Sequence, residues 1–185
     1  MLPNWTGQTV ACIASGPSLT VADCQTVMAS GLVTIVTNTT FRLCPWADAL
    51  FAFDRKWWTA HLAEVRSTFT GQSFTRLANP PKGVQHVAGF QKYGNSGACA
   101  VALAILCGAR KVVMIGYDCQ LTDGKTHHHG DHPPGFLNCG SIARWPAQFQ
   151  RVATYANRMR AEVVNASRES ALTCFRRVTL DDVLI

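Results

Sequence analysis

The chain has 185 residues, of which 48% are hydrophobic and 15% are charged, and its formal net charge at pH 7 is +6. This length and apolar content suit one domain with a substantial core and argue against a disordered chain. The longest uninterrupted apolar run, residues 98–107, is too short to cross a bilayer, and no basic segment followed by an apolar core opens the chain. We therefore expect a cytoplasmic protein with no membrane span.

The eight cysteines include no CxxC pair. Several lie inside apolar segments, where a free thiol behaves as a small hydrophobic side chain. A chain of this size needs no disulfides to fold, so we expect reduced cysteines. The modest positive charge suits anionic ligands such as nucleotides or nucleic acid, and it serves solubility equally well.

Segments of strand character alternate with helical segments along the chain. The first strand, at residues 9–14, is followed by a helix over 20–30, in which Thr20 and Asp23 have capping-box spacing and which ends at Gly31. Further strands are expected at 32–37, 48–53, 74–77, 83–88, 111–116, 162–165 and 173–177, and further helices after Asp54 and over 95–107 and 144–161. Such alternation predicts an α/β fold, a Rossmann-like three-layer sandwich with a mostly parallel sheet and helices on both faces.

We expect residues 1–185 to form a single Rossmann-like nucleotide-binding domain. Its one long aperiodic segment is a histidine-rich loop at 117–140, and a loop of that length inside a compact domain is more often functional than idle.

A Gly-Pro-Ser turn follows the first strand directly. Gly16 lets the backbone turn sharply and approach a ligand, and the helix after the turn presents unpaired N–H groups that attract anions. The turn matches neither the GKS/T phosphate loop nor the GxGxxG dinucleotide motif, which disfavours ATPases and dehydrogenases. We expect residues 15–18 to cradle a phosphate group.

Polar residues gather where the other predicted strands end, and ligands of parallel sheets bind at that edge. Ser18 has an alternative role as a helix cap, Asn38 and Asp54 as turn formers, and Asp118 as an acceptor for N–H groups of its own loop. The candidate nucleotide-binding residues are Ser15, Gly16, Pro17, Ser18, Asn38, Asp54, Asn95, Ser96, Gly97, Gly116, Tyr117 and Arg168, and Asp118 is a candidate catalytic residue.

The loop carries the cluster His127-His128-His129-Gly130-Asp131-His132. One interpretation is a divalent metal site for Mg, Mn or Zn, with His127, His129, Asp131 and His132 as ligands. A second is general acid–base catalysis by His129 or His132 with Asp131, since imidazole titrates near neutral pH. A third is a solvated loop without chemistry. No cofactor is established by the cluster alone.

Trp57 and Trp58 follow the third predicted strand. Their rings could stack on a base or a sugar, but packing of an amphipathic helix against the core is the more common role of such a pair.

Together these motifs resemble a known family. Residues 13–19, Asn38, 95–97 and 113–118 are similar to small bacterial sialyltransferases and to the related Rossmann-like proteins that include archaeal hydroxymethylpterin diphosphokinases. The whole chain, with Trp57 and the histidine cluster, more closely resembles proteins encoded by tailed bacteriophages and prophages, for which the host cytoplasm would be the location.

The resemblance to the sialyltransferases implies roles for individual residues. Gly16, Pro17 and Ser18 would line the nucleotide phosphate, Asn38 would hold the ribose or phosphate, and Ser96 and Gly97 would touch the nucleotide. It also implies that a loop histidine, His129 or His132, is the base that deprotonates the acceptor hydroxyl.

Three functions fit these observations. The first is a nucleotide-dependent transferase, glycosyltransferase-like, with a nucleotide-sugar donor and a histidine base. The second is a metal-dependent phosphotransferase or phosphohydrolase acting on a nucleotide, and the third is a non-catalytic nucleotide-binding phage accessory protein. Nucleic acid as acceptor and a homo-oligomeric state are both open.

Overall fold

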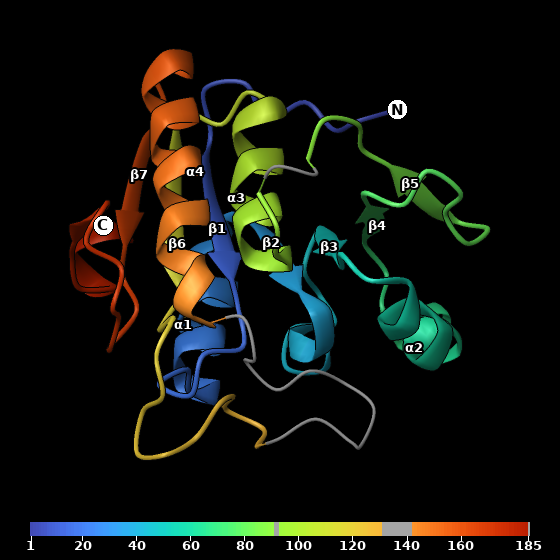
Figure 1. The fold of residues 1–185 in the computed structure, drawn as a ribbon, viewed down its shortest axis with the longest axis horizontal. Coiled ribbons are helices and arrows are strands. Elements are labelled where there is room, and N and C mark those ends of the chain that lie inside the picture. Colours follow the sequence, from blue (N-terminus) through green and yellow to red (C-terminus); the bar gives the residue numbers. More distant parts are fainter. Residues whose placement is uncertain (91–92, 131–141, 185) are drawn as a thin grey trace.

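Eight parallel strands form one open sheet in the order β5-β4-β3-β2-β1-β6-β7-β8 (Figure 1). The computed structural model describes residues 1–90, 93–130 and 142–184. In chain order the strands are β1 (Thr9–Ile13), β2 (Val33–Thr37), β3 (Ala49–Phe51), β4 (Gln72–Thr75), β5 (Val84–His86), β6 (Lys111–Ile115), β7 (Glu162–Asn165) and β8 (Arg176–Arg177).

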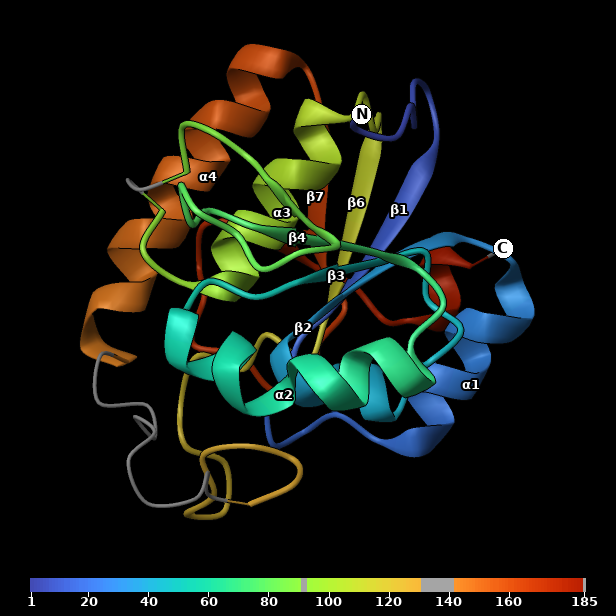
Figure 2. The same ribbon diagram turned by 90° about the vertical axis from the view of Figure 1, so that its right-hand side faces the viewer.

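Four α-helices cover the two faces of this sheet. Figure 2 shows α1 (Val21–Ser30) and α2 (Arg55–Thr68) on one side and α3 (Ser96–Leu106) and α4 (Trp145–Met159) on the other. The expected Rossmann-like α/β sandwich with a mostly parallel sheet is therefore confirmed.

The order of the strands places a crevice between β1 and β6. Strands β2 to β5 are added outward on one flank of β1, and α3 then returns the chain to the other flank, where Ile13 is in register with Ile115. In open parallel sheets such a reversal point separates the loops that follow the two central strands, and ligands bind there.

Local sequence signals explain the first helix. The capping box between Thr20 and Asp23 is present, and Gly31 ends α1 with a left-handed φ of 69°. Both features agree with the sequence expectation.

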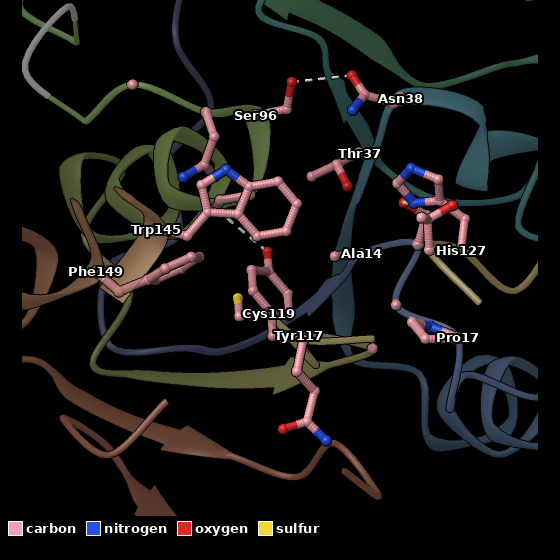
Figure 3. A pocket seen from close by; sticks show the side chains of 18 of the residues that line it. Ala14, Pro17, Thr37, Asn38, Ser96, Tyr117, Cys119, His127, Trp145 and Phe149 are labelled. Carbon is pink, nitrogen blue, oxygen red and sulfur yellow. Dashed lines mark hydrogen bonds between the residues drawn. The ribbon is translucent and has the colours of Figure 1, made fainter. Parts of the chain in front are cut away.

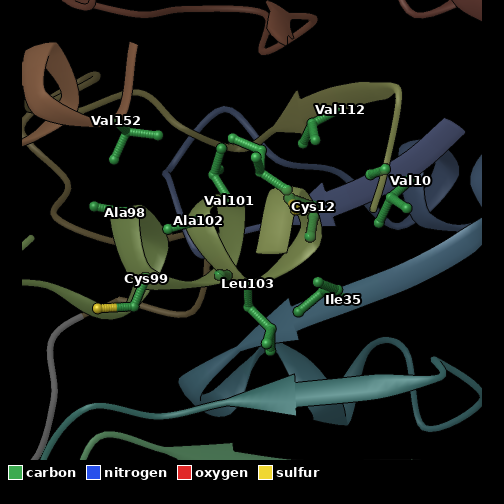
Figure 4. Close-up of a cluster of buried hydrophobic side chains, with 14 of the residues drawn as sticks. Val10, Cys12, Ile35, Ala98, Cys99, Val101, Ala102, Leu103, Val112 and Val152 are labelled. Carbon is green, nitrogen blue, oxygen red and sulfur yellow. The ribbon is translucent and has the colours of Figure 1, made fainter. Parts of the chain in front are cut away.

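The two faces of the sheet have separate apolar cores. In the core beneath α3 and α4, the buried side chains of Val10, Cys12 and Ile35 pack against α3 (Figure 4). Helix α3 is apolar all round because it lies between the sheet and α4, and Ala98 to Leu103 are fully buried.

The opposite core contains Trp57 and Trp58, which are 5% and 0% exposed. Trp58 donates from its indole N–H to the carbonyl of Ala52, and its ring meets that of Trp57 edge-on. The pair is therefore core, and the stacking interpretation of these residues is wrong.

The outer strands differ from the sequence expectation in their bounds. We expected a strand at 74–77, but β4 begins at Gln72, which pairs with Ala49, and it ends at Thr75. We expected an edge strand over 173–177, but β8 has two residues, because only Val164 and Asn165 of β7 pair with it.

In the described part of the chain, no helix combines the length and apolar character that a membrane crossing requires.

Candidate functional site

A pocket of about 190 Å³ opens at the carboxyl ends of β1, β2 and β6, beside the start of α3 (Figure 3). Its walls come from segments far apart in the sequence, which the parallel sheet brings to one edge. Eleven predicted residues line it, namely Ser15, Gly16, Pro17, Asn38, Asp54, Asn95, Ser96, Gly97, Gly116, Tyr117 and His127.

The Gly-Pro-Ser turn forms one wall, but its N–H groups point into the protein. Gly16 N–H donates to the carbonyl of Gly116 (2.8 Å), Ser18 N–H to the carboxylate of Asp118 (2.9 Å), and Leu19 N–H to the carbonyl of Gly16 (3.1 Å). Pro17 has no N–H to offer. In the predicted phosphate cradle at residues 15–18, the N–H groups of Gly16 and Ser18 are therefore already bonded within the protein, and the cradle stays a prediction.

At the start of α1, the N–H groups of Thr20 and Asp23 are also bonded within the protein. The Asp23 carboxylate accepts from Thr20 N–H at 3.0 Å, and Asp23 N–H donates to the Thr20 hydroxyl at 3.1 Å. No residue of α1 lines the pocket. The expected attraction of a bound anion to this helix end is thus not part of the site.

Asp118 lies beneath the turn and is 1% exposed. Besides the two bonds from Ser18, it accepts one from the hydroxyl of Thr122 at 3.1 Å. Burial raises the pKa of this carboxyl, and the hydrogen bonds of Ser18 and Thr122 oppose that rise. Asp118 holds the turn in place from outside the cavity, which is the alternative role that the sequence left open.

The same carboxylate explains the glycine at position 16. A Cβ built on Gly16 would overlap Asp118 Oδ1 and the carbonyl oxygen of Gly116. Close packing, rather than approach to a ligand, therefore excludes a side chain at this position.

Residues 127–129 of the histidine-rich loop pack against the carboxyl end of β1 and the residues after β2. His127 is 9% exposed, and its Nδ1 lies 3.0 Å from the Ser15 hydroxyl, while the N–H of His128 donates to the carbonyl of Ser15 at 3.0 Å. The exposed His129 stacks on His127 with ring centroids 5.1 Å apart, and its Nε2 lies 3.0 Å from the Thr39 hydroxyl. Of these histidines, His127 is the one that lines the pocket.

Two predicted catalytic and metal-binding residues, Asp131 and His132, lie outside the described residues. Within the parts of the chain that are described, no group of three or more His, Cys, Asp or Glu side chains is placed to hold a metal ion. The metal site of His127, His129, Asp131 and His132 stays a prediction.

A polar wall of the cavity contains Asn38 and Ser96. Asn38 follows β2 with a left-handed φ of 49°, an uncommon conformation for a residue with a side chain. Its Oδ1 accepts from the Ser96 hydroxyl at 2.9 Å, as Figure 3 shows, and the same hydroxyl accepts from Phe53 N–H at 3.0 Å. Asn95 caps α3 through Ala98 N–H at 2.8 Å.

An aromatic wall completes the pocket. Tyr117 and Phe149 meet edge-on at 5.7 Å, and the Tyr117 hydroxyl donates to the carbonyl of Gly97 at 3.3 Å. Figure 3 places the half-buried indole of Trp145 next to Tyr117 at the mouth of the cavity. Trp145 is not among the predicted site residues, because nothing in the sequence before α4 indicates that this end of the helix meets the carboxyl edge of the sheet.

Asp54 stands on the side of β3 and lines the pocket. It precedes α2 at the N-cap position but makes no capping hydrogen bond. Burial raises the pKa of its carboxyl, and the charge of Arg76 opposes that rise. Asp54 therefore lines the cavity and does not cap α2.

Arg168 lies elsewhere. Its guanidinium pairs with the Asp23 carboxylate at 2.7 Å and lines a separate cavity between α1 and the chain after β7. Burial disfavours ionisation of Asp23, but hydrogen bonds from Arg168 and Thr20 bring the pKa of this carboxyl below its usual value. The structure therefore does not bring Arg168 to the predicted nucleotide site.

No family model and no curated protein sequence matches this chain. Among solved structures, an epimerase from the methanogen Methanothermobacter thermautotrophicus gives a TM-score of 0.32 at 10% identity, over 88% of this chain and 52% of the epimerase. A short-chain dehydrogenase from Oenococcus oeni gives a TM-score of 0.26 at 8% identity, over 96% and 87% of the two chains. This chain spans about half the length of the epimerase, and both likenesses are too distant to assign a function.

Proposed function

We propose that this chain is a nucleotide-dependent transferase with a nucleotide-sugar donor, in which His127 is the base that activates the acceptor. The observation that carries the proposal is the position of His127, next to Ser15 in a pocket whose opposite wall is aromatic. A cavity with one stacking surface and a few convergent polar groups is typical of a small-molecule site.

The walls of the pocket suit the parts of a nucleotide. The indole of Trp145, with Tyr117 behind it, offers a face for a base to stack on. Asn38 and Asp54 supply amide and carboxylate oxygens that would accept from ribose or sugar hydroxyls.

His127 has the contact that a general base needs. When its Nδ1–H donates to the Ser15 hydroxyl, Nε2 carries the lone pair. In the transfer, the acceptor oxygen bonds to the anomeric carbon and its proton passes to His127. The bond from that carbon to the phosphate oxygen breaks, and the phosphate leaves with the electron pair.

A thermal-shift screen tests nucleotide binding first. The four common nucleosides, their 5′-mono- and diphosphates and their nucleotide sugars are each added with and without Mg²⁺, Mn²⁺ or Zn²⁺. A ligand at 100 times its dissociation constant stabilises the fold by about 2.7 kcal/mol, which is a measurable rise in melting temperature.

Single-turnover transfer from the donor that binds then tests His127. We expect His127→Asn to lower the rate by about 100- to 10,000-fold at unchanged donor affinity, while His86→Asn, on β5, has no effect. Donor binding without turnover under any acceptor would instead indicate a non-catalytic nucleotide-binding protein. No shift with any nucleotide would refute the proposal.

A further inference from the structure

Arg76 is an arginine whose charge no described acidic group neutralises by direct contact. It follows β4 immediately, and its Cζ lies 4.0 Å from the centroid of the Phe53 ring. The ion pairs among the described residues that involve arginine use Arg42, Arg168 and Arg176 instead.

Stacking explains where the guanidinium lies but not what its donors do. A guanidinium on a ring face is attracted by the ring, and its N–H groups point outward in the guanidinium plane. The Nε of Arg76 is buried without a hydrogen-bond partner. Because this atom has no exposed surface, a ligand cannot reach it. The terminal N–H groups of Arg76, which bond to no described residue, are the donors left for an acceptor from outside the chain.

Arg76 is linked to the pocket through its stacking partner. Phe53 N–H donates to the Ser96 hydroxyl, and Ser96 lines the pocket at the start of α3. The next residue, Asp54, also lines the pocket, and the charge of Arg76 acts on the pKa of its carboxyl. Arg76 does not itself line the pocket. It follows β4, the strand next to β3, and the end of β3 leads into Asp54.

We infer that Arg76 binds the phosphate groups of the nucleotide, which places the anion subsite beside β3 and β4 rather than at the turn after β1. This inference rests on the proposed nucleotide function and specifies at which end of the pocket the phosphate groups bind. The N–H groups of Gly16 and Ser18 are bonded within the protein, whereas Arg76 has a charge and terminal N–H groups that bond to no described residue. Arginine matches phosphate oxygens with two parallel hydrogen bonds, which strengthens such contacts.

Asp54 determines how the nucleotide is oriented in the pocket. Its carboxylate would repel a phosphate placed against it, so the phosphates lie on Arg76 and the hydroxyls of the sugar lie toward Asp54. The base is then left to the aromatic wall of Trp145 at the other end of the pocket.

Calorimetric titration of the wild-type protein and of Arg76→Gln tests the inference. The probes are adenosine, cytidine, guanosine and uridine, their 5′-diphosphates, and inorganic pyrophosphate. For the base that binds, we expect Arg76→Gln to weaken the diphosphate by about 10- to 100-fold and the nucleoside by less than about twofold.

Arg55→Gln is the matched control, because it removes the same charge from an exposed neighbour that bonds to the carbonyl of Asn79. It should leave both affinities unchanged. Arg76→Lys keeps the charge but not the planar pair of donors, and it should lose most of the phosphate-dependent gain. Melting temperatures show which variants fold, and Arg76→Lys carries the comparison if the glutamine variant does not.

The outcomes separate the two claims. If the variants at Arg76 keep the gain from phosphate, or lose nucleoside and diphosphate equally, the inference fails while the proposed function stands. If no nucleoside or nucleotide binds the wild-type protein, the proposed function fails, and the titration with pyrophosphate then tests the anion subsite alone. Pyrophosphate binding that Arg76→Gln abolishes supports the anion subsite, and its absence in the wild-type protein overturns it.

Discussion

Ser18 donates two hydrogen bonds to the carboxylate of Asp118, one from its backbone N–H at 2.9 Å and one from its hydroxyl at 2.8 Å. The contact joins the loop after β1 to the loop after β6, and these are the two strands that flank the pocket. Ser18 thus ties the turn at residues 16–18 to the loop on the other side of the pocket.

Asp118→Asn should destabilise the protein. The amide cannot accept both hydrogen bonds from Ser18 as the carboxylate does, so a half-buried donor of Ser18 loses its partner at a cost of about 1–2 kcal/mol. Urea unfolding measures the change, and Asp123→Asn, at an exposed position of the same loop, should stay within about 0.5 kcal/mol of wild type. A stable Asp118→Asn protein without activity would instead restore Asp118 as a catalytic residue.

Gly16→Ala should also destabilise the protein, because its Cβ would overlap the Asp118 carboxylate and the Gly116 carbonyl. Overpacking of this kind costs about 1–3 kcal/mol. Combining it with Asp118→Ala removes one of the two overlaps, so the double variant should be more stable than the sum of the single effects implies. Strict additivity in urea unfolding would show that the two side chains do not compete for space.

Trp145→Leu should weaken nucleoside binding by about 5- to 150-fold, because one stacked base is worth about 1–3 kcal/mol. Fluorescence gives a second readout, since a stacked base would quench the indole of Trp145 and Trp145→Phe should remove the quenching. Trp46→Leu, packed on the opposite core, is the control and should leave nucleoside affinity unchanged. Equal quenching in Trp145→Phe would place the base elsewhere.

Arg168→Gln should leave nucleotide affinity unchanged and reduce stability by up to about 1 kcal/mol, because the arginine is largely exposed although its partner is buried. The folded-state pKa of Asp23 is lower than its ordinary value of 3.8, so the stability this pair contributes is present above pH 3.8 and is lost as the pH falls through the folded pKa. Melting curves from pH 7 down to that range should converge for wild type and Arg168→Gln. Curves that stay parallel would contradict the pairing.

The positions of the strands and the edge of the sheet that carries the site could be read from the sequence. Strand composition located β1, β2 and β6 closely, and the rule for parallel sheets then brought Asn38, Ser96 and Tyr117 to one cavity. Those inferences succeed because they depend on local composition and on topology.

The direction of individual groups could not be read in the same way. Whether Gly16 N–H faces a ligand or the Gly116 carbonyl depends on a partner 100 residues away in the chain. Arg168 looked like a strand-end ligand and pairs with Asp23 instead. Trp145 belongs to no motif and reaches the pocket through tertiary packing, as Arg76 reaches the ring of Phe53.

The pairing of Ile13 with Ile115 also determines when the cavity can exist during synthesis. A ribosome that has released only the first half of the chain has made β1 without one of its two neighbours, and an unpaired strand edge invites contact with other chains. Translation must pass β6 before both sides of the crevice are present, so a nucleotide could act as a ligand of the finished protein but not as an early folding aid.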